Sequence, residues 1–264
     1  MINRNSVRPI AAAIALASLS STAYAQLEEV IVTAEKRETS LQSTPIAVSA
    51  FSQAELDAGL ITNNMDIQMS VPNMLMSKGF FTTASIAIRG IGNNAVGSFS
   101  DAGTGVHFNG VYLNNARIFE TEYFDTSRVE VLRGPQGTLY GRNTTGGVIN
   151  VISQKPTEEF GGDIQLQLGD YGHTKAKGAI NIPITDNLWQ RFSVFGLKRD
   201  GFVDNIYDGN DIDDRSMWAV RSSTTLHMGE STNATLVINY FEEDSNRMRG
   251  SGAICRRDPD GVLG

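Results

Sequence analysis

The chain has 264 residues, of which 22 are basic and 29 acidic, and its formal net charge is −7 at pH 7. This length allows one or two domains, and 26 glycines with 19% charged residues exclude both a disordered chain and a helical bundle. The basic residues are scattered, so no nucleic-acid surface is predicted. The single cysteine, Cys255, excludes an internal disulfide. The three histidines lack metal-ligand spacing, so neither a metal nor a cofactor is expected.

Residues 1–25 are predicted to be a cleavable signal peptide. Arg4 and Arg8 supply the positive start, and an apolar run follows, with a small-x-small cleavage site at Ala23–Ala25. A membrane anchor is the alternative, but the apolar run is too short to span a bilayer and ends in Ser and Thr. The protein is therefore expected to be exported, and to enter a membrane only as β-structure.

Residues 26–42 are predicted to be a partner-binding segment. They contain a β-branched, strand-like run on a polar terminus, formed by Glu29, Val30, Ile31, Val32, Thr33 and Ala34. An exposed strand of this kind is suited to β-augmentation, in which main-chain hydrogen bonds add it to the sheet of a partner. We therefore expect this run to be exposed.

Residues 43–155 are predicted to form an α+β domain. A strand over 45–51 precedes a helix that starts with a Ser52–Glu55 capping box. A second short helix is expected over 65–70, and strands over 85–90 and 106–113, the latter broken by Asn109–Gly110. Gly90–Ala95 matches the dinucleotide pattern G-x-G-x-x-A, but neither a helix pattern nor the required acidic residue follows, so no nucleotide site is predicted.

The centre of this domain is the stretch from Arg128 to Ser153. Two apolar runs, Val129–Leu132 and Val148–Ile152, predict buried strands. Between them lie glycines at 134, 137, 141, 146 and 147. Glycine permits positive φ and close backbone approach, so this loop is expected to fit a tight enclosure.

From residue 156 onward, apolar and polar residues alternate. Five segments show the pattern, although Leu188–Arg199 carries apolar groups on both faces. Short turns at Thr185–Asn187 and Gly229–Ser231 contrast with the long acidic connection Asp200–Asp214. Segments of about ten alternating residues with short turns at one end are typical of transmembrane β-barrels. A soluble antiparallel sandwich would alternate as well.

The run RVEVLRGPQGTLYGRNTTGGVINVISQKP resembles the end of the plug domain of TonB-dependent outer-membrane receptors; a glycine-rich hairpin of a soluble protein is the alternative. The resemblance implies a plug over 43–155, the first five or so strands of a transmembrane barrel over 156–264, and a TonB box at Glu29–Ala34. A barrel that holds a plug needs about 22 strands. The chain is therefore expected to be the N-terminal part of a longer receptor.

The resemblance also implies site residues. Arg89 and Arg133 match two plug motifs whose arginines face acidic groups of the barrel wall; a solvated surface arginine is the alternative. Asn109 stands where the family's D-G-V-Y turn has Asp, and Asn makes the same turn without the charge. Ligand contact is expected in the loops 91–105 and 114–120, at Asn94, Phe99, Asn115, Arg117 and Phe119.

The implied function is active uptake of a scarce ligand across the outer membrane, most often a ferric siderophore in such families. Partners would be TonB with its inner-membrane energising complex, the ligand and outer-membrane lipid. Cobalamin, haem and oligosaccharide remain open as ligands. The alternative is a truncated, non-transporting fragment that acts at most as a periplasmic plug-like binding module. No catalytic arrangement has supporting context, so no enzyme is expected.

Overall fold

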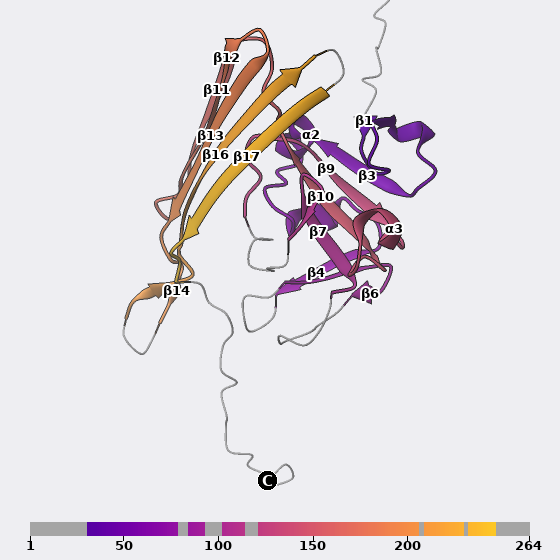
Figure 1. Ribbon diagram of the computed structural model, residues 1–264. Helices are drawn as coiled ribbons and strands as arrows, with labels where there is room; N and C mark the ends of the chain where they lie inside the picture. Colours follow the sequence, from indigo (N-terminus) through magenta and orange to yellow (C-terminus); the bar gives the residue numbers. More distant parts are fainter. Residues whose placement is uncertain are drawn as a thin grey trace, which may run out of the picture.

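The computed structural model describes residues 31–78, 84–92, 102–113, 121–205, 209–229 and 232–246. They form an N-terminal domain built on a mixed sheet, and a tall antiparallel sheet that stands beside it (Figure 1). No helix within these ranges has the length and apolar character needed to cross a membrane.

The mixed sheet has five strands in the order β3-β9-β10-β7-β8. Their bounds are Val48–Ser52 for β3, Thr126–Arg133 for β9, Gly147–Ser153 for β10, Thr104–Phe108 for β7 and Val111–Tyr112 for β8. β9 and β10 pair antiparallel, and β10 and β7 pair parallel. The two apolar runs predicted as buried strands thus form the centre of the sheet, and the predicted break at Asn109–Gly110 separates β7 from β8.

Smaller elements surround this sheet. β1 (Ile31–Val32) pairs with β2 (Thr39–Ser40), and β5 (Ala84–Ile88) pairs with both β4 (Met74–Lys78) and β6 (Ile91–Gly92). A short 3-10 helix, η1 (Leu41–Ser43), follows β2. Among the described residues, the larger core cluster of the domain is formed by β4, β5, Tyr123, buried residues between positions 56 and 71, and one face of the mixed sheet. β1 packs in a second cluster, which includes Leu132 and Val148 of the mixed sheet.

The helices are short, and two of them, η1 and α3, were not predicted. α2 (Gln53–Ala58) begins with the expected capping box, in which Ser52 Oγ accepts the Glu55 N–H and the Ser52 N–H donates to Glu55. The second expected helix is the single 3-10 turn η2 (Asp66–Met69). α3 (Gly137–Tyr140) lies inside the glycine-rich loop and ends at Gly141, whose φ of 83° suits a residue without a Cβ.

The antiparallel sheet has the order β11-β12-β13-β16-β17. Its strands are β11 (Gly161–Leu168), β12 (Thr174–Thr185), β13 (Leu188–Arg199), β16 (Arg215–Met228) and β17 (Thr232–Glu243). They correspond to the five segments predicted from alternation. The long acidic connection after β13 contains an unpredicted two-stranded ribbon, β14 (Val203–Asp204) with β15 (Asp211–Ile212).

The two faces of this sheet differ in chemistry. Large apolar side chains are exposed on one face, among them Ile164, Leu166, Phe192, Val194, Trp218, Val220, Leu236 and Ile238. Polar side chains are buried on the other, among them Lys175, Asn181, Ser193, Arg221 and Ser223. The irregular pattern of β13 has a local cause, since Phe195 and Leu197 pack with Phe124 of the N-terminal domain. The inner face therefore turns toward that domain.

Candidate functional site

The segment after residue 30 is docked on the N-terminal domain. β1 pairs with β2, and Val32 and Ala34 are completely buried in a cluster with Leu132, Tyr140 and Val148. The expectation of an exposed strand is therefore wrong for these two residues, because each buries its side chain against the mixed sheet instead of water. Ile31 remains 48% exposed, while Glu29 and Val30 lie outside the described residues.

A buried carboxylate on β9 holds Thr33. Glu130 is fully buried, and its Oε1 accepts the Thr33 N–H at 2.6 Å and the Thr33 hydroxyl at 3.2 Å. The Arg128 Nε donates to the same carboxylate oxygen at 2.7 Å, and its Nη2 donates to the Thr33 hydroxyl at 3.2 Å. A buried charge is costly unless it is paired and hydrogen-bonded. Thr33, Arg128 and Glu130 consequently form one interdependent group.

Tyr140 holds the other side of Thr33. Its hydroxyl donates to the Thr33 carbonyl oxygen at 3.2 Å, and the Lys36 N–H donates to that oxygen at 2.9 Å. Burial, and secondly the Glu130 charge, raise the pKa of Tyr140 to about 12, so the phenol keeps its proton at neutral pH. The Lys36 ammonium lies 4.2 Å from the centroid of the Tyr140 ring. Both backbone polar groups of Thr33 are thus occupied within the domain.

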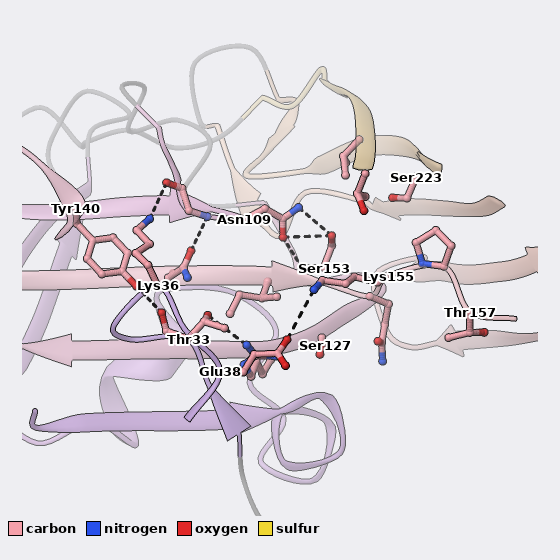
Figure 2. A pocket seen from close by; sticks show the side chains of 18 residues that line it. Thr33, Lys36, Glu38, Asn109, Ser127, Tyr140, Ser153, Lys155, Thr157 and Ser223 are labelled. Atoms are coloured by element: carbon pink, nitrogen blue, oxygen red, sulfur yellow. Dashed lines mark hydrogen bonds and ion pairs between the residues drawn. The ribbon is translucent and has the colours of Figure 1, made fainter. Parts of the chain in front are cut away.

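A cavity of about 560 Å³ lies beside the docked segment (Figure 2). Thr33, Lys36 and Glu38 line it from the segment, and Ser223 and Thr235 line it from β16 and β17. The exposed Lys155–Glu38 pair, at 3.9 Å, contributes little to stability. Because the segment forms part of its wall, departure of the segment would widen the cavity.

Asp125 joins the N-terminal domain to the antiparallel sheet. The Arg191 Nε donates to its two carboxylate oxygens at 3.0 and 2.9 Å, and Arg191 Nη2 donates to Oδ1 at 2.5 Å. The Ser193 hydroxyl donates to the same carboxylate. The Arg191 and Asp125 side chains are only 13% and 6% exposed. A forked arginine–carboxylate contact in such an enclosed place fixes both distance and orientation.

Two further contacts near Asp125 also join a cation of the antiparallel sheet to oxygen atoms of the N-terminal domain. Lys175 pairs with Glu122 at 2.9 Å, with both side chains largely buried. The Arg221 Nη1 donates to the carbonyl oxygens of Phe124 and Asp125, each at 3.1 Å. The acids belong to the N-terminal domain, and the cations belong to the inner face of the antiparallel sheet.

The sequence predicted the opposite polarity, with Arg89 and Arg133 facing acids of the barrel wall. Arg89 is exposed at a φ of 54°, and its guanidinium reaches toward Gly134, next to Arg133. Within the described ranges, the buried Arg133 Nε has no hydrogen-bond partner. The Arg89 guanidinium therefore lies close to the backbone of residue 134, and contact of either arginine with an acidic wall stays a prediction.

The predicted ligand residues Asn94, Phe99, Asn115, Arg117 and Phe119 lie outside the described residues. The described part of the chain contains no group of three or more His, Cys, Asp and Glu side chains placed to hold a metal ion. The residues that sequence reasoning missed are Glu122, Asp125, Glu130, Tyr140, Lys175, Arg191 and Arg221. One signal was available for three of them, since Lys175, Arg191 and Arg221 occupy the polar face of alternating strands.

Both the N-terminal domain and the longer chain are similar to known proteins. Residues 40–148 match the model of the TonB-dependent Receptor Plug Domain. An iron-regulated outer membrane virulence protein of Vibrio cholerae is 29% identical over 272 residues, which cover 96% of this chain and 40% of that protein. A vitamin B12 transporter, BtuB of Vibrio vulnificus, is 31% identical over 62% of this chain and 28% of its own length.

The fold is similar to that of solved receptors. The ferric yersiniabactin uptake receptor FyuA from Yersinia pestis aligns with a TM-score of 0.67 at 22% identity, over 74% of this chain and 31% of that one. The chain spans about 40% of the length of the Vibrio cholerae relative. Residues 40–148 therefore belong to the plug-domain family of TonB-dependent receptors, and the chain as a whole is similar in sequence and fold to outer-membrane receptors.

Proposed function

We propose that the protein takes part in TonB-dependent uptake of a ferric siderophore across the outer membrane. The docked segment that begins at residue 31 carries this proposal. It is a short β-branched strand that a partner sheet can extend by main-chain hydrogen bonds, and it packs on the plug at the edge of a cavity between plug and barrel strands. In this proposal Glu29–Ala34 is the TonB box, and TonB is the partner.

The relatives support an iron-containing ligand. The Vibrio cholerae relative is named as iron-regulated, and the similar solved structure is a ferric yersiniabactin receptor. The Vibrio vulnificus relative is named as a vitamin B12 transporter, so cobalamin is the competing ligand. Asn94, Phe99, Asn115, Arg117 and Phe119 are the proposed ligand contacts, and Arg89 and Arg133 are proposed to face the remainder of the barrel wall.

A pair of substitutions at residue 31 tests the proposal. Ile31→Pro removes the N–H of residue 31 and blocks strand addition there, so uptake is expected to fall about tenfold or more. Ile31→Ala keeps the N–H and is expected to retain most of the uptake. Cells that express the protein are given labelled ferric catecholate, hydroxamate and phenolate siderophores, and labelled cyanocobalamin, with and without TonB.

Three results of this experiment would contradict the proposal in different ways. Uptake that persists without TonB would exclude energised transport, and uptake of cyanocobalamin alone would exclude the siderophore. Binding without any uptake would favour the non-transporting alternative. Each result is read against the amount of protein recovered in the outer membrane.

The exposed apolar face of the antiparallel sheet is proposed to face lipid. Leu166 is 70% exposed and lies two residues before the end of β11, so Leu166→Arg is expected to destabilise the membrane-inserted protein by roughly 1 kcal/mol, less than a charge at the bilayer midplane would. Gln167→Arg places the same charge on the neighbouring, opposite-facing position and serves as the matched control. Urea unfolding in lipid vesicles measures both. Equal effects of the two substitutions would exclude a lipid-facing Leu166.

A further inference from the structure

The cluster around Thr33 has a consequence for partner binding. A partner strand that pairs with residue 33 needs its backbone N–H or its carbonyl oxygen. In this structure the N–H is held by Glu130, and the oxygen is held by Tyr140 and by the Lys36 N–H. Main-chain pairing at residue 33 and docking on the plug therefore exclude each other.

The contacts of the docked segment are unequal in strength. The β1–β2 pairing spans two residues on each strand, and an isolated ribbon of that length is not stable in water. The ion pair between Arg128 and Glu130 lies beneath the segment, and the short 2.6 Å bond to the Thr33 N–H has a charged acceptor. Bonds to charged groups are about twice as strong as neutral ones.

We propose that Glu130 is a latch, a positioning residue that sets how much of the segment 31–34 is available to a partner strand. The inference rests on the proposed role of this segment as the partner-binding strand. Glu130 makes its contacts with Thr33 only in the docked form, so it sets the equilibrium between docked and released forms even when no partner is present. Weakening the latch therefore raises the released population by itself.

Cysteine labelling measures that population without a partner or transport. The native Cys255 is replaced by Ser, Val32→Cys reports release of the segment, and Ile67→Cys reports opening of the plug core, since both side chains are fully buried. Each reporter is combined with Glu130→Gln in the full chain in outer-membrane preparations. A maleimide is the probe, and the labelling rate is the readout.

Glu130→Gln keeps the shape of the side chain but removes its charge. The labelling rate at Val32→Cys is expected to rise about 10- to 100-fold, the equivalent of losing one hydrogen bond to a charged group, while the rate at Ile67→Cys stays unchanged. Tyr140→Phe, which removes only the hydroxyl, is expected to give a smaller rise, about threefold to tenfold.

Val131→Ala is the matched control. Val131 is the next residue on β9 and equally buried, but it packs in the opposite core cluster, away from the segment. It loosens the plug without touching the latch. An unchanged rate at Val32→Cys in Glu130→Gln would overturn the proposal, as would an equal rise with Val131→Ala or at Ile67→Cys. Because no partner is present, failure of the uptake experiment would leave this result intact.

Discussion

Replacement of Asp125 by alanine is expected to weaken the attachment of the plug to the barrel strands by about 3–5 kcal/mol, the usual cost of removing one partner of a buried ion pair. The substitution leaves the largely buried Arg191 guanidinium with only the exposed Asp163 carboxylate, at 3.7 Å, in place of its hydrogen-bonded partner. It also removes the acceptor of the Ser193 hydroxyl. Hydrogen exchange of the plug strands in membrane-embedded protein measures the loss.

Asp125→Asn separates charge from backbone conformation. Asp125 has a φ of 48°, in the left-handed region that Asn tolerates and Ala does not. The Asn variant should keep the turn and part of the hydrogen bonding, and lose roughly half as much free energy. Asp57→Ala, on the exposed surface of α2, should change exchange by less than about 0.5 kcal/mol. If hydrogen exchange of the plug strands were the same in Asp125→Ala as in Asp57→Ala, Asp125 would not be the residue that attaches the plug to the barrel strands.

Gly147→Ala is expected to have a comparably large effect on the plug itself. A Cβ at this position would lie 2.3 Å from the Leu132 carbonyl oxygen and 2.9 Å from Ile88 Cδ1. The oxygen belongs to β9, which pairs with β10 in the mixed sheet, so the clash can be relieved only if β9 and β10 move apart. We expect a loss of about 3 kcal/mol or more in the free energy of unfolding of the plug, above the usual range for overpacking because the clash is with backbone.

Gly137→Ala is the control within the same loop, because a Cβ there meets nothing within 4 Å. Alanine is also the better helix former, and Gly137 opens α3. Limited proteolysis of the plug across a urea series measures both variants. If the Gly147→Ala protein resisted proteolysis as well as Gly137→Ala does, β9 and β10 would be able to move apart without loss of plug stability.

The position of Gly147 explains why the loop between β9 and β10 needs glycine. The sequence predicts that this loop fits a tight enclosure. The clash is with β9 of the same sheet, rather than with a surrounding wall. Gly146 shows a similar limit, since a Cβ there would lie 2.6 Å from the Ile91 carbonyl oxygen. The loop returns the chain tightly onto its own domain, so the enclosure at these two glycines is made by the plug.

Local patterns determined the elements of this protein. Alternation from residue 156 onward was enough to place five strands and their faces, because a strand sends successive side chains to opposite sides. The Ser52–Glu55 capping box was enough to start α2, because its hydrogen bonds join residues three apart. The motif from Arg128 to Ser153 was enough to indicate the plug family, and the family model matches residues 40–148.

Tertiary structure alone decided which side chains meet. Asp125 and Arg191 are 66 residues apart and Thr33 and Glu130 are 97 apart, so no periodicity relates them. Burial of Val32 against the sheet likewise depends on a surface that exists only after β9 and β10 have paired. Hydrophobic and hydrogen-bonding patterns specify a local conformation and its inward face. The partner of a charge or of a short strand is set by packing between distant segments, and that packing docks the segment 31–34 that the sequence alone predicted to be exposed.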